Sequence, residues 1–206
     1  MKITSIDIQK NSSRVNLFVD GEFYMGVPVD AILEFKLKKG MELDQNTMDR
    51  LRRFDEHQRT KFSAYKYLSY RQRSVNEMKK YLLSKGYGPA IISDVVSHLM
   101  ELGYLNDFDF AKSFVDDKSR LNYLGEYRLK YELRKKGIED SIITDVLSEI
   151  EPDIEELTEL VRKKYSKILS EDMAAAYRKI GGFLQRKGYG YDVVKRVLEG
   201  LRLEEE

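Results

Sequence analysis

A lysine followed by a glycine recurs at one position of a repeated motif, and this pattern has the clearest chemical meaning in the chain. The motif occurs three times with its glycines 51 residues apart, as Leu82-Leu83-Ser84-Lys85-Gly86, Leu133-Arg134-Lys135-Lys136-Gly137 and Leu184-Gln185-Arg186-Lys187-Gly188. A cation in the last turn of a helix opposes the negative end of the helix dipole, which would explain the lysines without any ligand. Cations at equivalent positions of stacked repeats would also form a ridge suited to a polyanion or an acidic groove.

The chain has few residues of the kinds that enzymes use. It contains no cysteine, and its two histidines, His57 and His98, lack the spacing to carboxylates or to each other that metal sites have. A serine elbow and a Gly-x-x-x-x-Gly-Lys phosphate loop are both absent from the sequence. We therefore expect a protein that is not an enzyme, with no catalytic, metal or cofactor site.

Charge is segregated along the chain, although the net charge is only +1. Residues 50–85 hold eleven lysines and arginines against three acids, whereas residues 138–160 hold nine acids and no base. Cations in such excess form either a solvated face or the footprint of an anionic partner. The candidate partner-binding residues are Arg71, Arg73, Lys79, Lys80, Lys85, Arg120, Lys130, Arg134, Lys135, Lys136, Arg186 and Lys187.

Tyrosines are interleaved with the cations of the basic segment. Tyr65 and Tyr81 fall on apolar stripes of helical period, so we expect them in the core. Tyr67, Tyr70 and Tyr87 do not, and on a surface their rings would suit stacking on single-stranded bases.

Residues 1–48 have the pattern of a small β-rich region. Apolar residues alternate with polar ones after Ile3, a β-branched run follows at Val15, and Asp20-Gly21 is typical of a tight hairpin. Asn11-Ser12-Ser13 has turn chemistry between the first two runs. We expect a three-stranded antiparallel meander followed by a short helix within residues 29–35.

From residue 49 onward the apolar spacing is helical, and the fold class is mainly α. The period predicts three tandem three-helix repeats over residues 49–104, 105–151 and 152–206. Ser74-Val75-Asn76-Glu77 is a capping box, and Gly181-Gly182 breaks the apolar stripe of the second helix of the third repeat, so we expect poor packing there. Units this small gain stability by stacking on their neighbours, so we expect an elongated, curved module.

Three motifs in order resemble the RecX family of recombinase regulators. Tyr67-Leu68-Ser69-Tyr70-Arg71-Gln72-Arg73-Ser74, followed by Leu82-x-x-Lys85-Gly86, resembles the family's first repeat. Gly103-Tyr104-Leu105-Asn106-Asp107, then Phe110-Ala111 and Arg120, is similar to its next motif. The run from Tyr131 to Ile138 is similar to its second-repeat pattern, so the resemblance covers about residues 60–201.

The resemblance implies a non-enzymatic regulator that acts in homologous recombination, DNA repair and the SOS response. Members of this family bind the RecA recombinase, are thought to lie in the groove of its filament on DNA, and inhibit its ATPase, strand exchange and filament growth. A regulator of this kind acts by preferring one state of the filament over another.

Other interpretations stay open at this point. A helical-repeat protein that binds single- or double-stranded DNA directly, without recombinase, would have the same basic segments. A helical scaffold with no link to DNA is a third interpretation. The N-terminus lacks the apolar run of a signal peptide or membrane span, so we expect a cytoplasmic monomer that does not contact a membrane.

Overall fold

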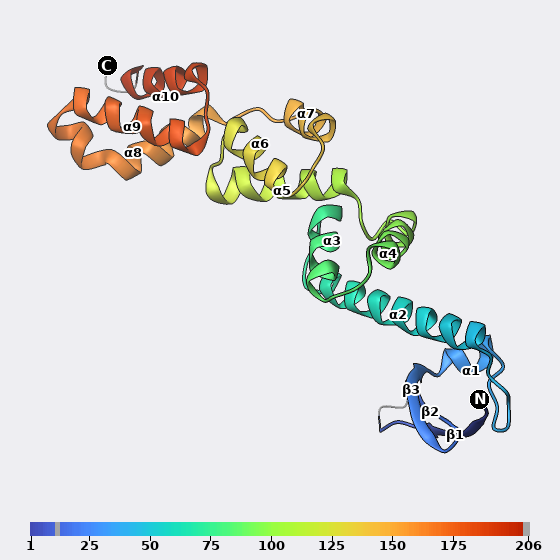
Figure 1. Cartoon of the computed structure of the whole chain (residues 1–206). Coiled ribbons are helices and arrows are strands. Elements are labelled where there is room, and N and C mark those ends of the chain that lie inside the picture. The colour runs from blue at the N-terminus through green and yellow to red at the C-terminus, as the bar shows by residue number, and fades with distance from the viewer. Residues whose placement is uncertain (11–12, 204–206) are drawn as a thin grey trace. The chain divides into compact units, whose positions relative to one another are not determined.

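The computed structural model describes residues 1–10 and 13–203 (Figure 1). The turn expected at residues 11–13 and the expected end of the third repeat at residue 206 therefore lie partly outside the described residues. The chain forms two compact units. The first consists of residues 1–71 with 78–104, and the second of residues 72–77 with the chain from Leu105 onward.

A three-stranded sheet begins the first unit, as the alternating pattern predicts. Strands β1 (Ile3–Ile8), β2 (Arg14–Val19) and β3 (Glu22–Pro28) pair antiparallel in the order β1-β2-β3. The turn between β2 and β3 uses Asp20 and Gly21 at φ values of 51° and 93°, and a two-residue hairpin turn of this kind needs positive φ at both positions. The short helix α1 (Asp30–Glu34) follows, again as expected.

The sheet packs against the N-terminal part of helix α2 (Gln45–Leu68). Its buried Met48 and Leu51 join one apolar cluster with Ile3 and Leu17 of the sheet. The helix begins at Gln45, so the expected start of helical structure near residue 49 is wrong. The first turn is polar and has no apolar stripe to detect, but Asp44 caps it by accepting a hydrogen bond from the Thr47 amide at 2.7 Å.

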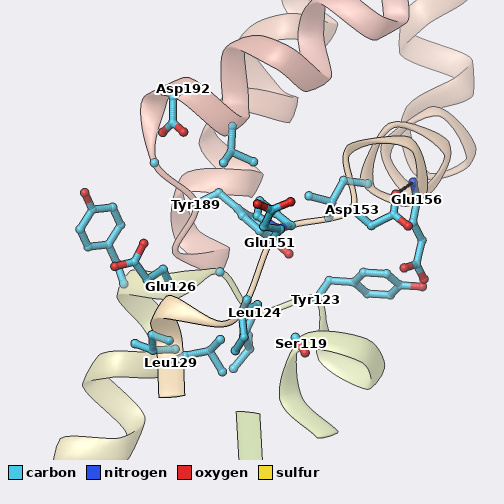
Figure 2. A pocket seen from close by; sticks show the side chains of 18 of the residues that line it. Ser119, Tyr123, Leu124, Glu126, Leu129, Glu151, Asp153, Glu156, Tyr189 and Asp192 are labelled. Carbon is cyan, nitrogen blue, oxygen red and sulfur yellow. Dashed lines mark hydrogen bonds between the residues drawn. The ribbon is translucent and has the colours of Figure 1, made fainter. Parts of the chain in front are cut away.

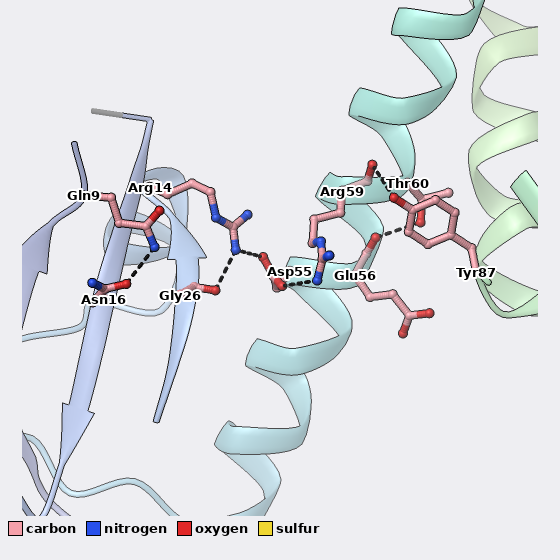
Figure 3. Close-up of polar contacts among 9 residues, drawn as sticks. All are labelled: Gln9, Arg14, Asn16, Gly26, Asp55, Glu56, Arg59, Thr60 and Tyr87. Carbon is pink, nitrogen blue, oxygen red and sulfur yellow. Dashed lines mark hydrogen bonds and ion pairs between the residues drawn. The ribbon is translucent and has the colours of Figure 1, made fainter. Parts of the chain in front are cut away.

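The buried carboxylate of Asp55 on α2 forms an ion pair with the sheet (Figure 3). Asp55 is 7% exposed, and its Oδ1 accepts a hydrogen bond from Arg14 Nη2 on β2 at 2.7 Å. The same Arg14 nitrogen donates to the carbonyl of Gly26 on β3 at 2.7 Å. The pair therefore links two strands to the helix through one arginine, and burial strengthens this link because water does not screen it.

Two further helices of the first repeat have the predicted ends. Helix α3 (Val75–Ser84) is followed by Gly86 at φ 85°, the left-handed conformation that glycine adopts most cheaply. Helix α4 (Pro89–Glu101) has proline in its first turn. Residues of both helices are fully buried, among them Met78, Leu82 and Leu99.

The second unit holds the other two repeats, each with three helices and its own apolar cluster. The second repeat consists of α5 (Asp107–Asn122), α6 (Glu126–Lys135) and α7 (Asp140–Ser148). The third consists of α8 (Ile154–Glu171), α9 (Met173–Lys187) and α10 (Tyr191–Leu203). Side chains of Asn106 and Asp153 cap α5 and α8.

Helix α9 continues through Gly181-Gly182 and its apolar face is packed on both sides of them, so the expected poor packing there is wrong. Ile180 and Leu184 on either side are fully buried, and a Cβ on Gly181 would lie 3.8 Å from Val194 Cγ1 on α10. Gly181 thus faces α10 at an ordinary van der Waals distance. Packing of the neighbouring side chains offsets the poor helix propensity of the two glycines, which is about 1 kcal/mol each relative to alanine.

Candidate partner-binding surface

The repeated lysine-glycine motif forms a joint between successive repeats, and the second unit contains two such joints. In the first, the carbonyl of Lys136 at the end of α6 accepts hydrogen bonds from Ser74 Oγ at 2.7 Å and Asn76 Nδ2 at 3.3 Å. Ser74 also completes the predicted capping box, because its Oγ accepts from the Glu77 amide at 3.1 Å. The start of the first repeat's second helix is therefore tied to the end of the second repeat's second helix.

The second joint lies between the start of α6 and the end of α9, and its hydrogen bonds join backbone atoms. The amides of Gly125 and Tyr127 at the start of α6 donate to the carbonyls of Lys187 and Gly188 at the end of α9, at 2.9 and 3.1 Å. Carbonyls at the C-terminal end of one helix thus meet amides at the N-terminal end of another. This contact satisfies groups that an isolated helix end leaves unpaired, and it aligns opposite ends of the two helix dipoles.

Two of the three repeated lysines are tied into these joints. Lys136 Nζ lies 2.5 Å from Glu77 Oε1, and its side chain is 27% exposed. Lys187 Nζ donates to the carbonyl of Asn122 at 2.6 Å. Lys85 of the first repeat differs, because it is exposed and its Nζ lies 5.5 Å from the ring centroid of Tyr81.

A groove of about 460 Å³ brings Lys136 and Lys187 together in the second unit. Two more cations, Lys118 of α5 and Arg128 of α6, also line it, and Glu132 is its one acid. Arg128 pairs with Glu132 at 2.7 Å, and Lys118 Nζ donates to Asn122 Oδ1 at 3.3 Å. Two carboxylates, Glu132 and the Glu77 partner of Lys136, offset part of this charge. The four residues of this cationic groove (Lys118, Arg128, Lys136 and Lys187) keep an excess of positive charge that suits a carboxylate or phosphate group of a partner.

The sequence did not single out Lys118 and Arg128. Both lie outside the repeated motif. Lys136 belongs to the same repeat as these two residues, and the joint between the second and third repeats adds Lys187 to the groove. One local signal existed, since Arg128 and Glu132 have the spacing of a helical ion pair.

The other candidate cations lie on the surface of their own unit. Arg134 forms a two-point ion pair with Asp140 at 2.7 and 2.9 Å, which raises the pKa of the guanidinium and lowers the pKa of the Asp140 carboxyl. Arg120 lies 3.4 Å from Asp116 on the same helix. Of the remaining candidates, Arg73 and Lys130 are half-buried, and the exposed ones are Arg71, Lys79, Lys80, Lys135 and Arg186.

The tyrosines of the basic segment only partly match expectation. Tyr70 is 72% exposed, as expected for a surface residue, but Tyr65 is 37% exposed and is not a core residue. Tyr67 stacks on Tyr81 with ring centroids 3.9 Å apart, so one face of its ring is covered. The Tyr87 hydroxyl contacts Ser63 Oγ at 2.8 Å and donates to the carbonyl of Arg59 at 3.2 Å (Figure 3 shows Tyr87 beside α2). Contacts with residues that are distant in sequence occupy Tyr67 and Tyr87, so their rings are not free to stack on bases.

Groups suited to acid–base or metal chemistry are scattered. Within residues 1–10 and 13–203, no cluster of histidines and carboxylates has the size that a metal ion needs. Burial, with a contribution from Lys61, lowers the pKa of His57. Nor does any helix in the described part of the chain have the length and apolar character to cross a membrane.

A small antiparallel sheet followed by three three-helix repeats with a cationic groove defines a helical-repeat protein. Sequence models of one family match these parts in order: the Regulatory protein RecX N-terminal domain over residues 1–44, and the first, second and third RecX three-helix domains over residues 61–99, 106–147 and 151–198. The chain belongs to the RecX family.

Individual relatives support this assignment over nearly the whole length. Regulatory protein RecX of Clostridium tetani is 34% identical over 205 residues, covering 97% of this chain and 94% of the relative. That of Bacillus subtilis is also 34% identical, covering 98% and 78%. A crystal structure of regulatory protein RecX shares the fold with a TM-score of 0.77 at 24% identity, covering 96% of this chain and 98% of that one. RecX from Lactobacillus salivarius gives a TM-score of 0.68 at 28% identity over 72% and 98%.

Proposed function

We propose that this protein binds the filament of the RecA recombinase on DNA and lowers its ATPase, strand exchange and filament growth without catalysing a reaction itself. The observation that carries the proposal is family membership, with 34% identity to a regulatory protein RecX over 97% of the chain. On this account the protein is a cytoplasmic monomer.

The proposed mechanism is a preference for one filament state. A bound protein shifts the balance between filament states only by the difference of its affinities for them, so tight binding alone would not regulate the filament.

Tandem repeats present similar surfaces at intervals along the chain, which suits a partner built from repeated subunits. We assign each of the segments 1–48, 49–104, 105–151 and 152–206 as one module.

We propose that cations carry the contact. The candidates are the exposed Arg71, Lys79, Lys80 and Lys85 in the first unit, and Arg73 and the cationic groove in the second. Phosphates of DNA or carboxylates of the recombinase are the groups that such a surface attracts.

The same cations favour a second candidate, direct DNA binding without recombinase. The two functions differ in which partner is bound more tightly and in how binding depends on salt. Binding to DNA alone would weaken steeply with salt, by about one unit of logarithmic slope for each phosphate neutralised.

The experiment compares the affinity of the labelled protein for recombinase assembled on single-stranded DNA with its affinity for the same DNA alone, at several salt concentrations. The proposal expects tighter binding to the assembled filament. Equal affinity for filament and bare DNA, with the steep salt slope, would favour the second candidate instead.

A further inference from the structure

A cavity of about 300 Å³ lies between the second and third repeats within the second unit (Figure 2). The ends of α5 and α7 and the starts of α6, α8 and α10 surround it. Its apolar lining comes from both repeats and consists of Leu124, Leu129, Leu147, Ile150, Leu157 and Val193. The cavity is therefore large enough for one long side chain and offers apolar surface to most of its length.

Carboxylates dominate the polar lining. Five acids line the cavity, with Arg120 and Arg196 as its two bases, and the acids are Glu126, Glu151, Asp153, Glu156 and Asp192. The closer view shows several of these acids beside the apolar residues of the cavity (Figure 2). An occupant with a positive charge would therefore be favoured over a neutral or anionic one.

Part of this acidity has a local structural role. Asp153 caps α8 by accepting a hydrogen bond from the Glu156 amide at 2.9 Å, and Glu126 and Asp192 stand in first turns, where they oppose the positive helix ends. Glu151 lies in the linker between α7 and α8, where no helix requires a carboxylate. Three helix ends with about half a positive charge each do not cancel the net excess of three acids.

Two tyrosines add aromatic surface to the lining. Burial raises the pKa of Tyr189 to about 12, so its ring stays neutral. Tyr123 ends α5 in the left-handed conformation at φ 52°, and its hydroxyl donates to the carboxylate of Glu156 on α8. A guanidinium group stacks favourably on such rings.

We propose that this cavity binds an arginine side chain, flanked by apolar residues, from a peptide segment of a partner protein. The stem of an arginine packs on apolar surface while its planar head pairs with carboxylates at two points, and the cavity offers both. Tyr127, which lines the cavity, is 66% exposed, and exposed aromatic residues of this kind are enriched where proteins meet. This favours a peptide over a free small cation, and the site does not depend on the identity of the proposed recombinase partner.

The test is an NMR titration of the isotope-labelled full chain with the peptide acetyl-Leu-Arg-Leu-amide. The matched probe replaces arginine by citrulline, which has the same shape without the charge, and a second arm uses arginine amide without the leucines. We expect amide shifts at the cavity residues, saturating at roughly millimolar peptide, with much weaker binding of both comparison compounds.

Variants then test the assigned acids. The double variant Glu126→Gln and Glu151→Gln should weaken peptide binding by about threefold to tenfold, and Arg196→Gln should strengthen it. The matched control, Glu139→Gln with Glu155→Gln, removes one acid near a linker and one in a first turn, neither of which lines the cavity, and should leave binding unchanged. A spectrum that keeps its dispersion shows that each variant is folded.

Four results would overturn the proposal. They are the absence of shifts at the cavity, equal binding of the citrulline peptide, equal binding of arginine amide, and an undiminished affinity of the double variant. Shifts of the same amides with protein concentration alone would assign the cavity to a second copy of this chain.

Discussion

Gly125 and Gly188 lie against each other so closely that neither position has room for a side chain. A Cβ on Gly125 would lie 2.6 Å from the carbonyl carbon of Gly188, and one on Gly188 would contact the backbone of Arg128. The close approach permits the backbone hydrogen bonds that join the third repeat to the second. Gly188 is thus needed for two reasons, the left-handed helix exit and the contact across the joint.

We predict that Gly188→Ala destabilises the protein by roughly 2–4 kcal/mol, because it adds a steric clash to the conformational strain. The matched control is Gly86→Ala at the equivalent position of the first repeat. Gly86 has φ 85°, but no atom lies within 4 Å of the place that a methyl group would take there, so only the strain of about 1 kcal/mol applies. Urea unfolding of both variants measures the difference, and equal losses would show that the close contact contributes nothing.

Ser74→Ala should lower the free energy of unfolding by about 1–2 kcal/mol, because one hydroxyl both caps α3 and donates to the Lys136 carbonyl of the next repeat. Ser84→Ala is the control, since Ser84 is exposed and bonds only within its own helix, to the Tyr81 carbonyl. Hydrogen exchange at residues 133–138 reports on the joint itself. Unchanged exchange there in Ser74→Ala would contradict the assigned contact.

Asp55→Ala should destabilise the attachment of the sheet to α2 by about 2 kcal/mol or more, because it leaves Arg14 without its carboxylate partner in a partly buried setting. A double-mutant cycle with Arg14→Ala isolates the coupling between the two side chains. A coupling energy near zero would mean that the pair does not hold the sheet. Asp49→Ala removes an exposed acid of the same helix and should have little effect.

Stability should fall in acid partly through Asp44. The hydrogen bonds from Thr47 lower the pKa of this carboxyl in the folded state, so its stabilising effect is present above the ordinary pKa and is lost as the pH falls through the lowered value. In the variant Asp44→Asn, the side-chain amide oxygen would cap the helix without titrating. The variant should therefore show a shallower loss of stability as the pH falls below the ordinary pKa of an aspartate, about 4, measured by urea unfolding at each pH, and an unaltered slope would contradict this assignment.

The combined variant Arg71→Ser, Arg73→Ser, Lys79→Ser and Lys80→Ser should retain its helicity and lose affinity for the recombinase filament by about tenfold or more. A control variant removes four exposed lysines outside the candidate set, Lys38, Lys39, Lys163 and Lys195, and so changes the net charge equally. Circular dichroism checks folding, and filament affinity is the readout. Equal losses in both variants would mean that overall charge, rather than the candidate surface, drives binding.

Local signals in the sequence predicted the fold well because the chemistry of caps and turns acts over a few residues. The Asp20-Gly21 hairpin, the Ser74 capping box and the Gly86 helix exit all form as expected. The expectation of poor packing at Gly181-Gly182 was wrong because it rested on a local break in the apolar stripe, whereas the flanking Ile180 and Leu184 are fully buried.

The candidate site was less accessible to sequence reasoning because it depends on contacts between repeats. The period identified Lys136 and Lys187 as equivalent, but only the joints show that each has a nearby partner and that both line one groove. Lys118 on α5 and Arg128 in the first turn of α6 both line that groove from positions outside the motif. Tyr67 and Tyr87 were misplaced for the same reason, since their partners are distant in sequence.

The most direct test of the proposed function is the ATPase rate of the recombinase on single-stranded DNA as this protein is titrated in. We predict that the rate falls when the protein is present at fewer copies than the recombinase, because one bound molecule biases the state of a filament segment. A DNA-only binding measurement serves as the control. An ATPase rate that stays constant up to equimolar protein, alongside tight binding to free DNA, would contradict the proposed function.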